Sequence, residues 1–120
     1  MAKDTITAPV LWWGAAVEVR SALERLKSTG PLTPTAYLAC RRRLDDLLAS
    51  WREVAPDDKV RNLAYEQLER FRLRAGDALQ LAAALVWCKE QPRNRFFVCG
   101  DERLTAAAHD GGFTTVTVVP

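Results

Sequence analysis

The sequence contains little cysteine or histidine and no long apolar run. Its three cysteines, Cys40, Cys88 and Cys99, are odd in number and widely spaced, which excludes a closed disulfide framework and a CxxC metal knuckle. A single histidine, His109, and the lack of a nucleophile motif such as GxSxG argue against a Ser/His/Asp or Cys/His hydrolase. No window reaches eighteen uninterrupted apolar residues, so we expect no membrane span.

The composition is typical of one soluble globular domain. We expect that domain to cover residues 1–120, because the chain has no repeat and no Ser/Gly linker. The start of the chain lacks the pattern of a signal peptide, so a cytoplasmic location is expected. The net charge of +2 is small, but 13 of the 17 basic residues are arginine. Arginine suits bidentate phosphate contacts, whereas a high-GC coding sequence would also favour it, and both explanations stay open.

Helix and strand signals alternate along the chain. Apolar residues at helical spacing and β-branched or aromatic runs predict the two kinds of element. The predicted helices are 9–26, 33–48, 56–71, 78–87 and 101–109, and the predicted strands are 5–8, 51–54, 95–99 and 113–119. Such alternation is typical of an α/β domain with a mostly parallel sheet flanked by helices.

Glu18 lies in an apolar stretch, residues 15–19 (AAVEV), of the first predicted helix. A buried and unpaired carboxylate is costly, so such a residue is usually paired with a cation or protonated. A metal ligand fits this pattern. A salt bridge to Arg20 or Arg25, or a position at the edge of the apolar face, fits it as well.

Asp77 and Asp101 stand at predicted helix starts, where acidic residues commonly act as caps. Asp101 also directly follows the predicted strand 95–99. In a parallel α/β sheet, strand carboxyl ends and the next helix amino ends meet at one edge. Carboxylates gathered there repel one another unless a divalent cation lies between them, and oxygen-only ligands favour Mg²⁺ or Mn²⁺. We therefore take Glu18, Asp77 and Asp101 as the candidate metal ligands and catalytic residues.

Three segments resemble PIN domains and follow the order found in that family. Residues 73–85, LRAGDALQLAAAL, are similar to the family segment LRAxDALHLAAAL. Residues 97–104, FVCGDERL, together with the alanines and Gly-Phe that follow, resemble its FVTxDxRL…AA…GF ending. Residues 17–23, VEVRSAL, resemble its VEVRxAL helix.

This resemblance implies a PIN-like three-layer domain and a VapC-like toxin ribonuclease of a type II toxin–antitoxin system. PIN domains hold one or two Mg²⁺ or Mn²⁺ ions with four acidic residues, and Glu18, Asp77 and Asp101 match the second, third and fourth. Arg74 and Arg103, inside the matching motifs, are candidate contacts to the RNA substrate. The resemblance also implies a homodimer and a cognate antitoxin.

The chain departs from the PIN pattern at its amino terminus. The family opens with a strand that ends in Asp followed by Ser or Thr, whereas only 17 residues precede Glu18 here. We therefore expect an N-terminally truncated domain that lacks the first acidic residue. Losing a central strand exposes sheet edges and apolar faces, which a partner chain, a segment exchanged within an oligomer or a rearranged N-terminus would cover. Gln80 and Cys99 replace the family's His and Thr without removing a carboxylate.

Three functional interpretations follow from the sequence. The first is an active metal-dependent endoribonuclease, weakened by loss of the first Asp. The second is a non-catalytic PIN-like remnant that binds a protein or RNA. The third is a fragment of an ordinary active enzyme.

Overall fold

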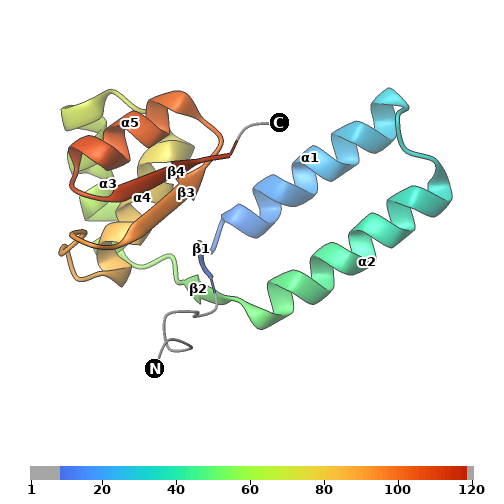
Figure 1. The fold of residues 1–120 in the computed structure, drawn as a ribbon, viewed down its shortest axis with the longest axis horizontal. Coiled ribbons are helices and arrows are strands. Elements are labelled where there is room, and N and C mark those ends of the chain that lie inside the picture. The colour runs from blue at the N-terminus through green and yellow to red at the C-terminus, as the bar shows by residue number, and fades with distance from the viewer. Residues whose placement is uncertain (1–8, 119–120) are drawn as a thin grey trace. The chain divides into compact units, whose positions relative to one another are not determined.

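The structure is a computed structural model and describes residues 9–118 (Figure 1). These residues form five helices and four short strands, so the predicted α/β composition is confirmed. The chain divides into two compact units, Met1–Glu53 and Val54–Pro120. The prediction of a single domain and that of a PIN-like three-layer architecture both stay predictions. Within the described range, none of the helices is long and apolar enough to cross a membrane.

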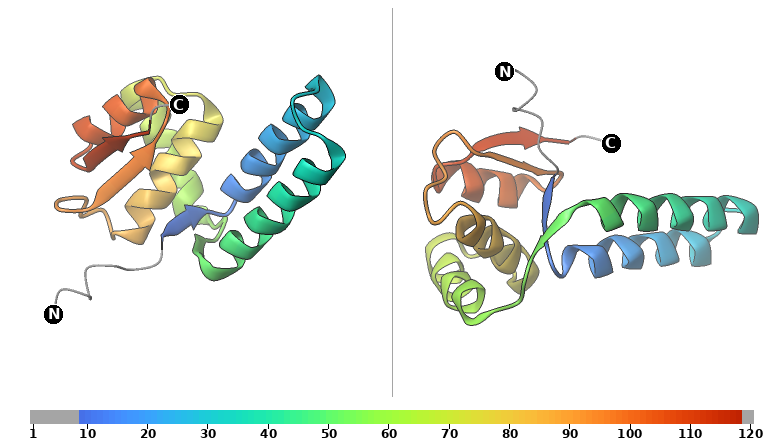
Figure 2. Two further views of the ribbon diagram at one scale, coloured as in Figure 1. Left: turned by 45° about the vertical axis from the view of Figure 1, so that its right-hand side comes forward. Right: turned by 90° about the horizontal axis from the view of Figure 1, so that it is seen from below.

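The N-terminal unit is a helical hairpin whose two ends are joined by a pair of strands. β1 (Val10–Trp12) pairs with β2 (Arg52–Val54), and the Arg52 amide donates to the Pro9 carbonyl at 3.3 Å. Between the strands, α1 (Ala15–Thr29) and α2 (Pro34–Ser50) run antiparallel, as the views in Figures 1 and 2 agree.

The turn between α1 and α2 follows from its glycine, threonine and proline. Gly30 ends α1 with a φ of 104°, a conformation that glycine adopts without the steric cost of a Cβ. Thr33 caps α2 by accepting the Ala36 amide at 3.1 Å, and Pro34 takes the first helical position, where its missing N–H is not needed. The predicted start of this helix is confirmed.

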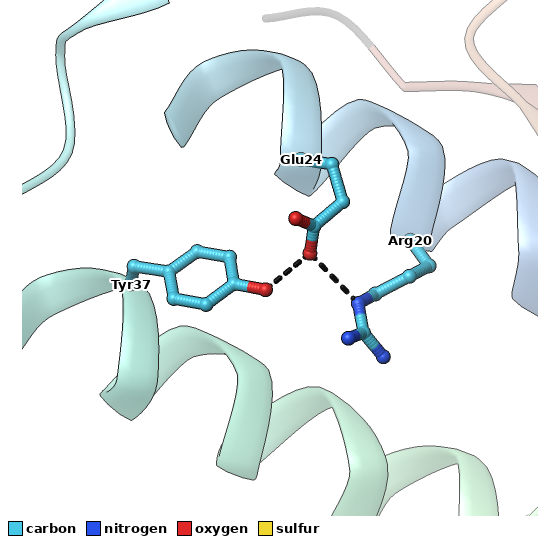
Figure 3. Close-up of polar contacts among 3 residues, drawn as sticks. All are labelled: Arg20, Glu24 and Tyr37. Atoms are coloured by element: carbon cyan, nitrogen blue, oxygen red, sulfur yellow. Dashed lines mark hydrogen bonds and ion pairs between the residues drawn. The ribbon is translucent and has the colours of Figure 1, made fainter. Parts of the chain in front are cut away.

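The contact between α1 and α2 is narrow and partly polar. Leu23 and Tyr37 are its buried side chains. The Tyr37 hydroxyl donates to Glu24 Oε2, which also accepts from Arg20 Nε at 2.9 Å (Figure 3). Lys27 Nζ lies 4.3 Å from the centroid of the Tyr37 ring. The Tyr37 bond, followed by the Arg20 bond, lowers the pKa of Glu24, so this cluster favours the ionised carboxylate.

The predicted helix 9–26 is wrong at its start. Residues 10–12 form β1, and α1 begins only at Ala15. The run Val10–Trp12 is apolar and favours a strand, and a stretch this short cannot be told from a helical turn by periodicity alone. The predicted strand 5–8 lies outside the described residues.

The C-terminal unit contains three helices and a parallel pair of strands. α3 (Asp58–Phe71) lies against α4 (Ala75–Trp87), which contacts α5 (Glu102–Asp110). α5 in turn packs on β3 (Phe96–Cys99) and β4 (Thr114–Thr117), which run side by side (Figure 1). The two strands are parallel, as predicted, with Phe97 opposite Thr115. The described strands thus form two separate two-stranded sheets rather than the single sheet expected.

Small residues allow α4 to lie deep in this unit. Ala78, Leu81, Ala82 and Ala83 are at most 1% exposed, so this side of α4 is interior as predicted for the apolar stretch 78–87, whereas Trp87 at its end is 45% exposed. A polar side chain is also enclosed, because Gln67 of α3 is buried. Among the described residues, no buried side-chain nitrogen or oxygen lacks a hydrogen-bond partner, so this polar burial is compensated.

The β3–β4 pair is buried on one face and exposed on the other. Phe97 is buried and its ring lies 5.5 Å from that of Phe113. Phe96, Val98 and Val116, on the opposite face, are exposed. Parallel strands are usually covered on both faces, so the exposed face of this pair is unusually apolar for an uncovered surface.

Candidate metal and phosphate site in the C-terminal unit

Asp77 and Asp101 lie at the same end of the C-terminal unit. Asp77 is in the first turn of α4, and Asp101 immediately precedes α5, two residues after β3 ends. Both border a cavity of about 740 Å³ that lies between the amino ends of these helices. Its lining consists of Arg74, Gly76, Asp77, Gly100, Asp101, Glu102 and Arg103.

Asp101 is held in place by its role as the cap of α5. Its Oδ1 accepts the Leu104 amide at 2.8 Å. Its backbone carbonyl accepts the Thr105 hydroxyl at 2.7 Å, and that hydroxyl lies 3.0 Å from Cys99 Sγ. The cap uses one of the two carboxylate oxygens. A capping residue that is fixed in this way can therefore still offer Oδ2 to a ligand.

Asp77 is half-buried beside a like charge and does not cap its helix. The capping position of α4 belongs to Arg74, and no side chain makes the cap hydrogen bond there. Burial raises the pKa of Asp77, and the negative charge of Asp101 raises it further, against the opposing effect of Arg74 and Arg103. The two carboxylates are therefore close enough to repel each other. A cation between them would offset that repulsion.

Arg74 and Arg103 give the cavity a second, basic character. Both side chains are exposed and line the same cavity as the carboxylates. Guanidinium groups beside two helix amino ends form a suitable environment for a phosphate group. The cavity thus offers carboxylates for a cation and arginines for an anion.

Two residues of this site were not among those predicted from the sequence. Glu102 lines the cavity beside Asp101, and its only sequence signal is its place in the first turn of a helix. Thr105 orders the Asp101 backbone through its hydroxyl, and its signal is the spacing of four residues from a capping aspartate. The same hydroxyl lies beside the Cys99 thiol.

Glu18 belongs to the N-terminal unit and lies in the first turn of α1. Its side chain is exposed, and the adjacent Val17 and Val19 are exposed as well. Neither expected arginine pairs with it, because Arg20 bonds Glu24 and Arg25 contacts Ser21. Across residues 9–118, no three His, Cys, Asp or Glu side chains are grouped so that they could hold a metal ion. The assignment of Glu18 as a third metal ligand stays a prediction.

The donor set of the cavity fits a hydrated divalent cation. Mg²⁺ usually keeps several waters and is bound by one or two carboxylates together with substrate phosphates. Asp77 and Asp101 supply that number of carboxylates, and Arg74 and Arg103 could hold the phosphate. The Cys99 thiol, near this end, donates to the Asp101 carbonyl at 3.4 Å. The chemistry of the cavity therefore favours an oxygen-bound ion.

Comparison of the chain with protein-family models, curated proteins and solved structures gave no match.

Proposed function

We propose that the protein is a Mg²⁺- or Mn²⁺-dependent endoribonuclease of the VapC toxin type that acts in the cytoplasm. The cavity shared by Asp77, Asp101, Arg74 and Arg103 carries this proposal. The resemblance of residues 73–85 and 97–104 to PIN motifs supports it, because those motifs contain the same two aspartates.

Four side chains of the cavity have a defined task in this mechanism. Asp77 and Asp101 would hold the ion, which would supply an activated water and charge stabilisation for the leaving oxygen of a phosphodiester. Arg74 and Arg103 bind the phosphate and orient the RNA strand, since their guanidinium groups suit its oxygens. The capping bond of Asp101 to Leu104 keeps that carboxylate in one orientation before substrate arrives.

The partners proposed with this function follow from the family resemblance. They are an RNA substrate, a second copy of the chain and a cognate antitoxin. Glu18 is the third ligand that the resemblance implies, and the proposal does not depend on it.

The decisive experiment is a cleavage assay on a single-stranded RNA oligonucleotide. We expect cleavage with Mn²⁺ or Mg²⁺, none with a chelator, and none with Asp77→Asn. Asp110→Asn is the matched control, because Asp110 is an exposed aspartate at the far end of α5. Cleavage that survives both the chelator and Asp77→Asn would contradict the proposal.

A non-catalytic role is the second candidate. It is favoured because, among residues 9–118, no three acidic side chains are grouped so that they could hold a metal ion, whereas PIN domains use four. In that case the chain binds RNA or a protein through Arg74 and Arg103 and cuts nothing. Metal-independent RNA binding that is lost in Arg74→Ala with Arg103→Ala, without cleavage by the unmodified chain under any metal, would support this role over the first.

A further inference from the structure

Gly76 is the second residue of α4 and lines the cavity that contains Asp77 and Asp101. Glycine is less stable in a helix than alanine, because it loses more backbone freedom on folding. The residues on either side of the Gly76–Asp77 pair are alanines, which are the strongest helix formers. A glycine at this position therefore calls for a specific reason.

The other five of the six glycines in the chain each have such a reason in the backbone or in the packing. Gly30 and Gly112 have φ angles of 104° and 110°, where a side chain is strained. At Gly14, Gly100 and Gly111, an added Cβ would come within 3.3 Å of another atom. An alanine at any of these positions would strain the backbone or displace a neighbour.

Gly76 has neither reason. Its φ is not positive, and a Cβ added to it would meet no atom within 4 Å in the described part of the chain. The fold therefore tolerates a side chain at this position, and the space which that side chain would enter is open. A glycine that the fold does not require, at the border of a charged cavity, leaves room for what the cavity binds.

We propose that Gly76 is a specificity-determining residue of the ribonuclease site, because its missing side chain leaves room for the RNA strand to cross the first turn of α4. Glycine is the usual residue where a ligand approaches the backbone closely. Arg74 and Asp77 lie within two residues of Gly76 in the sequence, and all three line the cavity. A strand whose phosphate is held by Arg74 and reaches an ion at Asp77 must therefore pass beside Gly76.

The size of the cavity agrees with this role. Its volume of about 740 Å³ lies within the range of about 300 to 1,000 Å³ that is typical of ligand pockets. A larger residue at position 76 would take up part of the room next to Asp77 without removing a charged group. This inference rests on the proposed function and adds to it the residue that admits the substrate.

Gly76→Ala and Gly76→Leu test the proposal, with Ala75→Leu as the matched control. Ala75 is the first residue of α4, is exposed and does not line the cavity. In the Mn²⁺-dependent cleavage of a single-stranded RNA oligonucleotide, Gly76→Leu should raise KM by about tenfold, as a modest steric overlap implies. Gly76→Ala should raise KM by a smaller factor, and kcat should change less than KM, since the overlap weakens binding of the strand. Ala75→Leu should keep the KM of the unmodified chain.

Two measurements without RNA separate a loss of space from damage to the fold or to the ion site. Gly76→Ala should unfold at a higher urea concentration than the unmodified chain, because alanine favours the helix. All three variants should keep the stabilisation that Mn²⁺ gives the unmodified chain, because Asp77 and Asp101 are unchanged.

The outcomes distinguish this inference from the proposed function. If the unmodified chain cleaves RNA and Gly76→Leu keeps its KM, the inference is overturned and the proposed function stands. Equal effects of Gly76→Leu and Ala75→Leu would overturn the inference as well. It would also fail if Gly76→Ala unfolds at a lower urea concentration or if Gly76→Leu loses the Mn²⁺-induced stabilisation, because the glycine would then serve the fold or the ion site. An unmodified chain that cleaves no RNA with either ion overturns the proposed function and this inference with it.

Discussion

Asp101 combines a cap and a candidate metal ligand, and substitutions can separate the two roles. Asparagine keeps an Oδ1 atom that can accept the Leu104 amide, whereas alanine removes the acceptor. Loss of such a cap costs about 1 kcal/mol of stability, or a fall in melting temperature of about 4 °C. Asp101→Asn should destabilise the fold less than Asp101→Ala. The asparagine loses the favourable charge near the helix amino end, but this loss is offset because the repulsion with Asp77 is relieved.

The two roles respond differently to added metal. A ligand that binds the folded state stabilises it by about 2.7 kcal/mol at a hundred times its Kd. With Mn²⁺ at that excess, the unmodified protein should gain this amount in urea unfolding, and Asp101→Asn and Asp101→Ala should gain less than about 0.5 kcal/mol. Only the alanine variant should also lose the cap energy without metal.

Asp57 provides the control for this experiment. It caps α3 by accepting the Val60 amide at 3.1 Å and is not part of the cavity. Asp57→Ala should therefore cost about 1 kcal/mol and keep the full Mn²⁺-induced gain. If Asp101→Asn also keeps that gain, the carboxylate does not bind the ion and the reasoning for the site fails.

Three further predictions follow from side chains already described. Because the pKa of Asp77 is raised in the folded protein, its protonated carboxyl contributes to the free energy of unfolding below the unfolded pKa of about 4. That contribution is lost as the pH rises through the pKa of Asp77 in the folded protein. Asp77→Asn should then raise stability at neutral pH without metal, and equal or lower stability in urea unfolding would refute this. Tyr37→Phe removes the largest cause of the lowered Glu24 pKa, so carboxyl NMR should show that pKa rise towards its usual range; an unchanged titration would be inconsistent with the bond. Leu81 is 1% exposed, so Leu81→Ala should lower the free energy of unfolding by about 3 kcal/mol. Leu38 is 55% exposed, so Leu38→Ala should lower it by under about 0.5 kcal/mol. Similar losses for the two variants would contradict the assigned core.

The sequence was most informative where a side chain acts on the backbone next to it. Thr33 and Pro34 predicted the start of α2, because capping is a local interaction. The predicted start of the third helix at residue 56 lies two residues before the observed start of α3, which Asp57 caps. Strand-to-helix alternation also placed Asp101 at the carboxyl end of a strand, where the structure has it. These predictions needed no knowledge of what lies across the molecule.

The sequence was least informative where the outcome depends on packing. Periodicity could not tell that Val10–Trp12 would pair with β2 rather than join α1. The apolar neighbours of Glu18 suggested burial, yet Val17 and Val19 are exposed together with it. A periodic pattern shows which side chains lie on the same side of a helix. Whether another element packs on that side depends on the tertiary structure, which the pattern does not contain.

The bond between Arg52 and Pro9 has a consequence for how this sequence can vary. Because β1 and β2 pair side by side, the two ends of the α1–α2 hairpin lie next to each other, and the residues between the strands form a closed loop. For a flexible loop, doubling the length costs only about 0.6 kcal/mol of closure entropy, and here α1 and α2 would have to lengthen together so that the added turns pack on each other. The hairpin can therefore gain or lose whole helical turns over evolutionary time while the strands that begin and end it keep their positions.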